Sequence, residues 1–392
     1  MPGKSSDQRR ALDALNAAMV PVLEAAGAEF IDPDIIQPAD VFLERSGEHI
    51  RSRTYLFTSP DGEELCLRPD LTVPACRYHL ESATDPAQPA RYCYAGKAFR
   101  HTPGEAGRTP VREFDQVGLE IFGAGNTAHD DAEVLALTLA ALKAAGVSGY
   151  RIEIGDLGLF DALLHSIDMP ERWRNRLKRQ FWRPRAFRDL LRQLSAGKRK
   201  ARTAISGLLD EMEDSGLEPV AFVEQHLEAL DLQMIAGRTV EQVAGRLAEK
   251  LLDRSQPPLT AEQIGLIDDY LAIRCAPEDA TARLRGIAGR TGGVFAGAVD
   301  LFEARLQAMR EAGLDLAAME FAAVFGRSLE YYTGFVFQIE RDGPDGASQN
   351  IAGGGRYDTM LADIGAGQHV PAVGLAIQAS RLIGDGGSGG EA

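Results

Sequence analysis

The sequence predicts an α/β protein of the mixed α+β kind, in which a helical insertion interrupts a domain built on an antiparallel sheet. Neighbouring strand signals over residues 54–122 favour antiparallel pairing over alternating βαβ units. Strand signals then vanish between about residues 159 and 319, where helical runs dominate, and they return towards the C-terminal end. The insertion is therefore expected to split the sheet domain into two segments of sequence.

The composition is that of an ordinary globular chain with an acidic balance. Its 392 residues include 42 Lys and Arg against 57 Asp and Glu, a formal charge of −15, and at roughly 150 residues per domain such a length predicts two or three domains. Charges interrupt the apolar stretches well before the roughly 18 residues that a membrane span needs. Residues 1–10 lack the apolar core of a secretion signal, and four cysteines without a CxxC pair do not suit a disulfide framework. We therefore expect a protein of the cytoplasm without a membrane partner.

The N-terminal elements follow from caps, periodicity and turn residues. Apolar residues at helical spacing predict a helix from Ser5 to about Ala26, with Gly27 as its stop. A short strand is expected at 30–33, and the strand signals at 54–57 and 64–68 flank a Pro-Asp-Gly turn that favours a hairpin. The next elements are strands at 91–94 and 112–122 joined by a Gly/Pro-rich loop at 101–110, a helix at 127–145 and a strand at 151–154.

The insertion and the return of the sheet follow from the same signals. Helical runs such as 227–235 and 239–252 define the insertion. The sheet domain resumes with strands at 320–324, 335–340 and 372–377, a Gly-rich turn at 353–355 and a short final helix.

One window of the insertion is strongly basic. Residues 172–202 hold thirteen Lys and Arg against the single acid Asp189, a net charge of +12 that leaves −27 for the rest of the chain. Because Trp173 and Trp182 lie in the same window, stacking combined with phosphate contact is one interpretation. The favoured alternative is a solvated helical face that packs on acidic parts of the protein or of a partner. A tRNA partner is accordingly not expected.

Two clusters of polar residues in the first half of the chain could carry chemistry. Asp70 and Thr72 lie two residues apart at a strand end, so both can reach one ligand group, although a pair that caps the next helix is the commoner arrangement. Along 112–120 the alternation puts Gln116 and Glu120 on one face of a strand. That face either lines a pocket or lies in water.

Two further clusters lie near the C-terminal end. Arg327 next to a turn, followed by Tyr331 and Tyr332, could clamp a carboxylate and supply aromatic walls, or these could be a surface cation and two core tyrosines. The glycines at 353–355 permit close backbone approach but more often simply form a turn. The sequence holds no metal-ligand pattern, no GxSxG motif and no Walker motif, so we expect neither a metal nor another cofactor.

Taken in order, six segments resemble the catalytic domain of histidyl-tRNA synthetase, a class II aminoacyl-tRNA synthetase. The segments are 67–72, 99–101, 116–120, 327–332, 354–358 and 371–381. The resemblance implies an antiparallel sheet flanked by helices, and a dimer formed through the segment around Pro33. The expected domain bounds are a synthetase-like core of 8–160 and 318–384, a helical insertion of 161–317 and a disordered tail of 385–392.

Residue by residue, the resemblance implies a histidine-binding pocket. Asp70 stands where the family usually has Glu. Arg327 or Arg100 would meet the carboxylate of the ligand, Gln116 and Asp70 its ammonium, and Glu120 its imidazole. The residues expected to bind histidine are Asp70, Thr72, Arg100, Gln116, Glu120, Arg327, Tyr331, Tyr332 and Tyr357.

The ATP motifs of that family are incomplete in this sequence. Thr102 follows Phe-Arg-His where the family has Glu, and Gln-Ala-Ser precedes Arg381 where Gly-Leu-Glu is usual. The residual ATP site would comprise Arg112, Phe114 and Arg381. We also expect no anticodon-binding domain.

This combination is similar to the regulatory subunits of ATP phosphoribosyltransferase, which are synthetase paralogues in histidine biosynthesis. The resemblance implies a non-catalytic subunit that forms a hetero-oligomer with a short-form catalytic subunit, supports its activity and allows feedback regulation by histidine. One alternative is a truncated histidyl-tRNA synthetase, a histidine–tRNA ligase, or a tRNA-acting paralogue that adenylates histidine. Another is a histidine-binding module unrelated to phosphoribosyl transfer.

Overall fold

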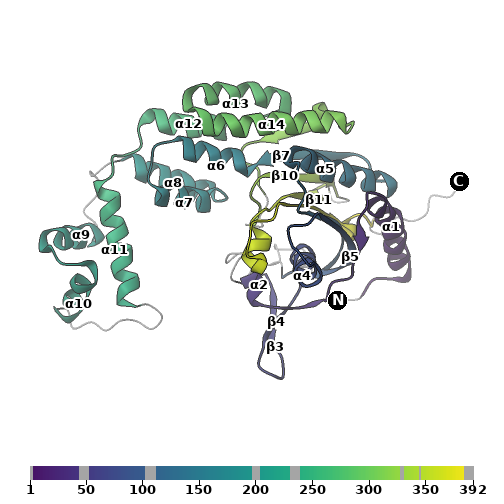
Figure 1. Cartoon of the computed structure of the whole chain (residues 1–392), viewed down its shortest axis with the longest axis horizontal. Helices are drawn as coiled ribbons and strands as arrows, with labels where there is room; N and C mark the ends of the chain where they lie inside the picture. Colours follow the sequence, from purple (N-terminus) through teal and green to yellow (C-terminus); the bar gives the residue numbers. More distant parts are fainter. Residues whose placement is uncertain are drawn as a thin grey trace. The chain divides into compact units, whose positions relative to one another are not determined.

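The computed structural model describes residues 3–43, 53–101, 112–196, 204–229, 239–326, 331–343 and 346–383. The chain divides into two units, one of residues 1–168 and 269–392 and the other of residues 169–268 (Figure 1). The expected insertion of 161–317 is longer than the second unit, because the helices of 277–311 pack with the sheet-bearing unit. The tail expected at 385–392 lies outside the described residues.

A nine-stranded sheet forms the framework of the first unit, in the order β1-β5-β6-β12-β11-β10-β7-β9-β8. From β5 to β7 in this order each strand pairs antiparallel with the next, so the predicted antiparallel sheet is confirmed, whereas β1 pairs parallel with β5 and β9 pairs parallel with β7. The strands are β1 Glu29–Phe30, β5 Ala90–Phe99, β6 Glu113–Phe122, β7 Tyr150–Asp156, β8 Arg274–Cys275, β9 Met319–Ala322, β10 Phe335–Asp342, β11 Ser348–Arg356 and β12 Ala372–Gln378. A second, three-stranded sheet comprises β2 Ile36–Pro38, β4 Glu64–Leu67 and β3 Tyr55–Thr58, and it contains the predicted hairpin.

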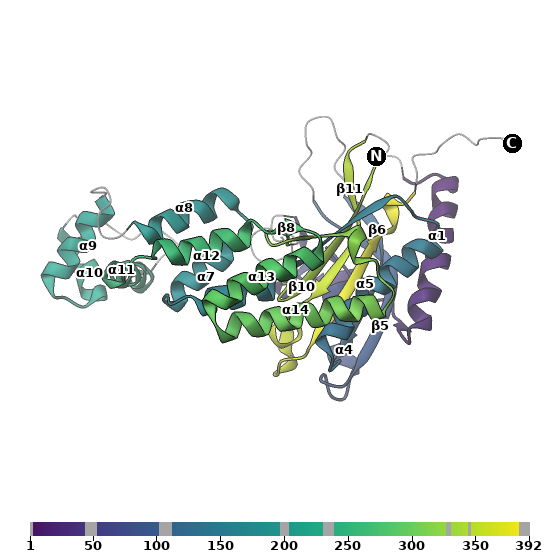
Figure 2. The same ribbon diagram turned by 90° about the horizontal axis from the view of Figure 1, so that it is seen from above.

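Helices cover both faces of the large sheet. Helix α5 packs on β11 and β12 and is itself covered by α14, whereas α4 lies against β6 on the opposite side (Figures 1 and 2). The first helix begins as predicted, because Ser5 and Gln8 form a capping box at its N-terminus. The helices of this unit are α1 Ser6–Ala25, α2 Asp40–Leu43, α4 Thr72–Ser82, α5 Thr127–Ala144, α6 Leu157–Ser166, α13 Pro277–Thr291 and α14 Gly293–Glu311, with short helical turns at Leu316–Ala318, Ala362–Ala366 and Ala379–Arg381.

The second unit is helical in its described part. It contains α7 Glu171–Gln180, α8 Pro184–Ser195, α9 Ala204–Ser215, α10 Pro219–Ala229 and α11 Val240–Ser255, and α12 Ala261–Leu271 spans its boundary. Helices α9 to α11 share an apolar core that includes Met212, Phe222 and Leu247. The run predicted at 239–252 corresponds to α11, whereas 230–238 lie outside the described residues. Among the described helices of the chain, none is long and apolar enough to cross a membrane.

The Gly-rich turn predicted at 353–355 is wrong, because these residues form part of β11. The glycines serve close packing between strands. A Cβ on Gly354 would lie 2.1 Å from the carbonyl oxygen of Gly374 on the neighbouring strand and 2.8 Å from the ring of Phe337. The close backbone approach that these glycines permit is therefore, at Gly354, an approach to a neighbouring strand.

Candidate functional site

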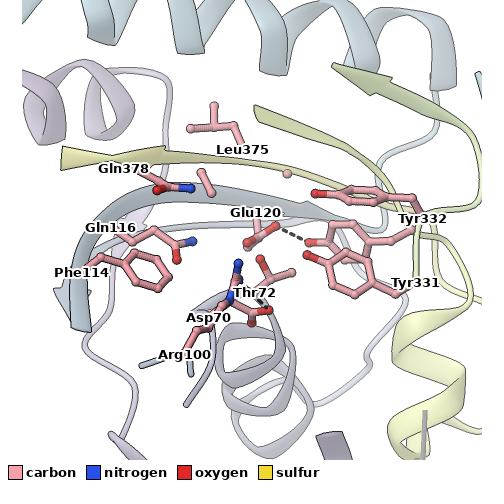
Figure 3. A pocket seen from close by; sticks show the side chains of 13 residues that line it. Asp70, Thr72, Arg100, Phe114, Gln116, Glu120, Tyr331, Tyr332, Leu375 and Gln378 are labelled. Atoms are coloured by element: carbon pink, nitrogen blue, oxygen red, sulfur yellow. Dashed lines mark hydrogen bonds and ion pairs between the residues drawn. The ribbon is translucent and has the colours of Figure 1, made fainter. Parts of the chain in front are cut away.

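A polar pocket opens on the face of the large sheet that carries α4 (Figure 3). Residues of β6 and β12 form its floor. Its walls come from the start of α4, from Arg100 just after β5, from the residues before β10 and from Tyr357 just after β11. It holds about 440 Å³ of unfilled space, part of it open to solvent. Its lining residues are Asp70, Thr72, Arg100, Phe114, Gln116, Glu120, Tyr331, Tyr332, Tyr357, Gly374, Leu375, Ala376 and Gln378.

Glu120 is the most deeply buried acid of this pocket, with only 1% of its surface exposed. The hydroxyl of Tyr94 donates to Oε1 at 2.8 Å, and the hydroxyl of Tyr357 donates to Oε2. Burial raises the pKa of Glu120 from 4.5 to about 7, while hydrogen bonds from Tyr357, Tyr94 and Thr72 act in the opposite direction. The pocket thus holds a carboxyl group that titrates near neutral pH and has its acceptor oxygens already oriented.

Two glycines make room for this arrangement. Gly374 pairs with Glu120 across the β6–β12 ladder, and a Cβ there would lie 1.7 Å from Oε2 of Glu120. Gly118 pairs with Tyr94, and a Cβ there would lie 2.5 Å from the Tyr94 ring and hydroxyl. Because neither position carries a side chain, the Glu120 carboxylate and the Tyr94 phenol can lie flat against the sheet and meet.

Asp70 brings a second buried carboxylate into the pocket, with 3% of its surface exposed. Its Oδ1 accepts from the backbone N–H of Val73 at 3.3 Å, so it supports the first turn of α4 as well as facing the pocket. Arg100 Nη2 lies 3.8 Å from Asp70 Oδ2, and Arg100 Nε donates to the carbonyl of Pro69 at 2.7 Å. Asp70 therefore both faces the pocket and accepts one N–H of the first turn of α4, whose N-cap residue is Leu71.

Aromatic rings close one side of the pocket. The ring centroids of Tyr331 and Tyr332 lie 4.6 Å apart, and that of Tyr357 lies 5.6 Å from Tyr331. On another side, the Arg100 guanidinium lies 5.3 Å from the centroid of the Phe114 ring. A flat ligand ring would thus meet aromatic walls and two buried carboxyl groups.

The structure brings most of the predicted site residues together. Asp70, Thr72, Arg100, Gln116, Glu120, Tyr331, Tyr332 and Tyr357 all line the pocket, as does Phe114 from the predicted ATP site. Arg327 lies outside the described residues.

Two residues of the predicted ATP site do not line the pocket. Arg112 is exposed, and its carbonyl accepts from the Arg100 N–H at 3.0 Å. Arg381 Nη1 donates to the carbonyl of Asn350 at 2.5 Å. Partial desolvation, and then the nearby charge of Arg100, lower the pKa of Arg381. The charge of Arg100 thus acts on Arg381, although Arg381 does not line the pocket.

Sequence reasoning missed Tyr94 and Gln378. Tyr94 contacts both Glu120 and Gln116, whose Nε2 lies 3.4 Å from its hydroxyl. Its strand was predicted, but only the pairing of that strand with β6, in which Tyr94 lies opposite Gly118, reveals the contact. Gln378, at the end of β12, enters the pocket for the same reason: β12 is the other neighbour of β6.

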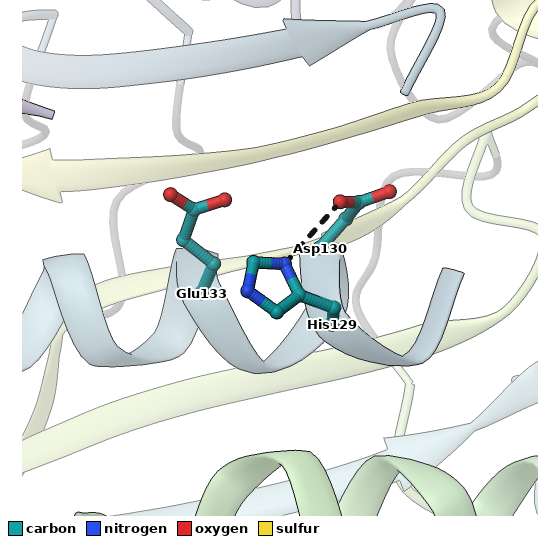
Figure 4. Close-up of side chains that lie close together, drawn as sticks. All are labelled: His129, Asp130 and Glu133. Carbon is teal, nitrogen blue, oxygen red and sulfur yellow. Dashed lines mark ion pairs between the residues drawn. The ribbon is translucent and has the colours of Figure 1, made fainter. Parts of the chain in front are cut away.

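Outside the pocket, His129, Asp130 and Glu133 gather ligand-type atoms within 4.8 Å of one another on the first turns of α5 (Figure 4). Arg91 occupies both oxygens of Glu133 at 2.6 and 2.8 Å. A cation at this position would have to displace that guanidinium, so the cluster supports no metal assignment.

Comparison with known structures shows the class of the fold. A structure described as an ATP phosphoribosyltransferase regulatory subunit/histidyl-tRNA synthetase from Bacillus halodurans C matches with a TM-score of 0.66 and 21% identity, covering 98% of this chain and 81% of that one. Histidyl-tRNA synthetase from Nostoc sp. PCC 7120 matches with a TM-score of 0.62 and 20% identity, covering 97% and 73%. The fold is therefore that of class II histidyl-tRNA synthetases.

Sequence comparison is more specific. The histidyl-tRNA synthetase family model matches residues 5–249 and 258–382. The ATP phosphoribosyltransferase regulatory subunit of Brucella anthropi is 35% identical over 364 residues, which cover 92% of this chain and 94% of that protein. That of Allorhizobium ampelinum is 34% identical over 368 residues, which cover 93% and 95%. The chain belongs to the family of ATP phosphoribosyltransferase regulatory subunits.

Proposed function

We propose that this chain is the regulatory subunit of an ATP phosphoribosyltransferase in histidine biosynthesis, and that it binds histidine in the pocket around Glu120. In this proposal it has no catalytic activity of its own, supports a short-form catalytic subunit in the cytoplasm and transmits feedback regulation by histidine. The observation that carries the proposal is end-to-end similarity to regulatory subunits at about 35% identity, combined with a pocket whose groups complement histidine.

The groups that line the pocket match the parts of histidine one by one. Asp70 and Gln116 supply acceptors for the ammonium, and Glu120 accepts a hydrogen bond from an imidazole N–H. Arg100 supplies a guanidinium for the carboxylate. Tyr331 and its neighbouring tyrosines form the wall against which the imidazole would lie.

The test has three parts. First, the purified chain should form a complex with a short-form catalytic subunit, measured by co-elution. Second, calorimetry should detect histidine binding to the chain, reduced at least about tenfold by Glu120→Ala because a buried acceptor of the ligand is lost. Third, histidine-dependent ATP–pyrophosphate exchange should be absent. Robust exchange, or normal binding by Glu120→Ala, would contradict the proposal.

A second candidate, a ligase that adenylates histidine, draws on one observation. Phe114 lines the pocket beneath Arg100, and Arg381 lies close enough to Arg100 to feel its charge. Such a pair of cations next to an aromatic ring could hold a nucleoside triphosphate. The exchange assay separates the candidates, because only the ligase forms an adenylate and releases pyrophosphate.

We further propose that the chain self-associates as a dimer through its three-stranded sheet. This small sheet and the residues before it expose four large apolar side chains, with exposed fractions between 39% and 52%: Ile35, Ile36, Leu56 and Phe57. Such a concentration of apolar surface favours a protein contact. Sedimentation of the purified chain should give the mass of a dimer, and Ile36→Glu should shift it towards the monomer. A wild-type monomer, or a variant that remains dimeric, would contradict this surface.

A further inference from the structure

A cluster of buried charges lies on the side of the large sheet opposite the pocket. Asp131 on α5 accepts from Arg305 Nε of α14 and from Arg356 Nε of β11, both at 2.8 Å. Arg305 Nη1 also donates to Asp156 at 2.7 Å. None of these four residues is more than 5% exposed. The cluster therefore joins two helices and two strands through charges that depend on one another.

This cluster reaches the pocket through two successive residues, Arg356 at the end of β11 and Tyr357 directly after it. Neighbouring residues of a strand point to opposite faces of the sheet. Arg356 accordingly points towards Asp131 on the α5 side, and Tyr357 points towards Glu120 on the α4 side. The position of one side chain is thus tied to the position of the other.

Bonds to Arg356 and to Ala372 hold the backbone on both sides of Tyr357. Arg356 Nη1 donates to Asp358 Oδ1 at 2.9 Å, and the same oxygen accepts from the Ala372 N–H at 2.9 Å. The carbonyl of Arg356 accepts from the Thr333 N–H at 2.8 Å, and the Tyr357 N–H donates to the Ala372 carbonyl at 2.8 Å. These bonds restrict Tyr357, and the one from the Arg356 guanidinium to Asp358 ties that restriction to the ion cluster.

We propose that Arg356 is a positioning residue for the pocket: anchored on Asp131, it holds the Tyr357 hydroxyl on Glu120 and so sets how well the pocket accepts a ligand. The ligand part of this inference rests on the proposed function, whereas the action on Glu120 does not. The ion cluster then supports the pocket. A displacement of α5 or α14 relative to the sheet would move Arg356, and through Arg356 it would change the position of Tyr357 in the pocket.

Several groups face Glu120 and share in its titration. Tyr94 and Tyr357 donate hydrogen bonds to it, as does Thr72, and Asp70 adds a second negative charge. Cys76 lies behind them on α4 and interacts with both Tyr357 and Glu120. Loss of the Tyr357 hydrogen bond removes a contact that favours the charged carboxylate, so the titration of Glu120 moves to higher pH.

The experiment follows Glu120 directly by carboxyl carbon NMR in protein labelled on its glutamate side chains, with the signal assigned by its absence in Glu120→Gln. Tyr357→Phe should raise the titration midpoint by about one pH unit, as loss of one charge-assisted hydrogen bond predicts. Arg356→Lys and Asp358→Asn should also raise the titration midpoint of Glu120. Asp358→Asn leaves the Asp131–Arg305 pair intact, which guards against a variant that fails to fold. Leu23→Ala, a buried apolar truncation in α1, is the matched control and should leave the midpoint unchanged.

Histidine calorimetry on the same proteins supplies a double-mutant cycle. Arg356→Lys should weaken histidine binding about fivefold or more. The double variant Arg356→Lys/Tyr357→Phe should bind only slightly more weakly than Tyr357→Phe alone, because the effects of residues that act through one another are not additive. An unchanged Glu120 midpoint in both Arg356→Lys and Asp358→Asn, or binding losses that simply multiply, would overturn the inference. If the wild-type chain does not bind histidine, the proposed function fails, while the NMR titration still decides the role of Arg356.

Discussion

At the scale of single residues, Glu120 joins the stability of the fold to the chemistry of the pocket. The folded chain holds its proton more tightly than the unfolded chain does, because burial raises the pKa of Glu120 from 4.5 to about 7. Its contribution to the free energy of unfolding is therefore fully present below about pH 4.5 and is lost as the pH rises through 7.

We predict that Glu120→Gln removes this dependence. Relative to the variant, the wild-type free energy of unfolding should fall by about 3 kcal/mol between pH 4.5 and pH 8, from a shift of roughly 2.5 units at 1.36 kcal/mol each. Urea unfolding at a series of pH values measures this difference. Glu113→Gln, an exposed carboxylate of the same strand that is ion-paired with Lys97, is the control and should run parallel to the wild type. Parallel curves for Glu120→Gln would show that Glu120 does not titrate as described.

A second prediction at this scale concerns Gly374. Alanine there would place a methyl group 1.7 Å from the Glu120 carboxylate, so the carboxylate or β12 must shift. We expect Gly374→Ala to weaken histidine binding at least about tenfold and to destabilise the fold by about 1–3 kcal/mol, as overpacking does. Gly286→Ala on α13, where a Cβ meets nothing within 4 Å, serves as the control for calorimetry and thermal unfolding. Wild-type affinity in Gly374→Ala would mean that Glu120 need not lie flat against β12.

At the scale of elements, the basic window separates into two groups of cations. Arg172 and Arg176 of α7, together with the Trp173 indole N–H, all donate to the Asp253 carboxylate of α11, at 2.8 Å for Arg176 and 2.6 Å for Trp173. These residues are structural. Helix α8 and the turn before it instead leave Arg183, Arg185 and Arg188 exposed. The thirteen cations look alike in the sequence, and packing separates these two roles among those that the structure describes.

We therefore predict that Asp253 stabilises the second unit. Asp253→Ala leaves several donors of α7 without their acceptor, which should cost about 1–3 kcal/mol. Hydrogen exchange should show faster opening of α7 and α11, while the strands of the large sheet keep their protection. Asp189→Ala, which removes the exposed partner of Arg192 on α8, should change little. Equal protection in Asp253→Ala and wild type would contradict the assignment.

At the scale of the whole molecule, the acidic net charge disfavours a nucleic-acid partner. Outside the window at 172–202 the chain carries −27. We predict that the purified chain does not retain tRNA at about 0.15 M salt. Repulsion between the tRNA phosphates and the acidic remainder of the chain opposes the phosphate contacts that the exposed cations could make. Filter binding across a salt series measures it. Steeply salt-dependent binding that Arg185→Glu and Arg188→Glu abolish would reverse the prediction, and these positions test it better than Arg172 or Arg176, which Asp253 already holds.

Much of the fold could be predicted from local signals. The capping box at Ser5, the turn between β3 and β4 and the alternation along β6 each depend on residues near one another in sequence, so their elements were expected where they occur. The turn expected at 353–355 is wrong because a glycine run more often forms a turn, whereas here it serves close packing. Only the position of Gly374 on the next strand distinguishes the two.

The contacts in the pocket could not be predicted from local sequence alone. Its residue types were expected because separate motifs occur in a familiar order, but their contacts arise from strand order. Glu120 and Tyr357 are 237 residues apart and meet because β6 and β11 both flank β12. The sequence does not show that Asp131, Arg305 and Arg356 form ion pairs, because a buried charged residue cannot be told from an exposed one by residue type alone. Elements and residue types follow from short-range sterics and hydrophobic periodicity, whereas the pairing of buried charges follows from which strands and helices pack together, and that is a property of the folded chain.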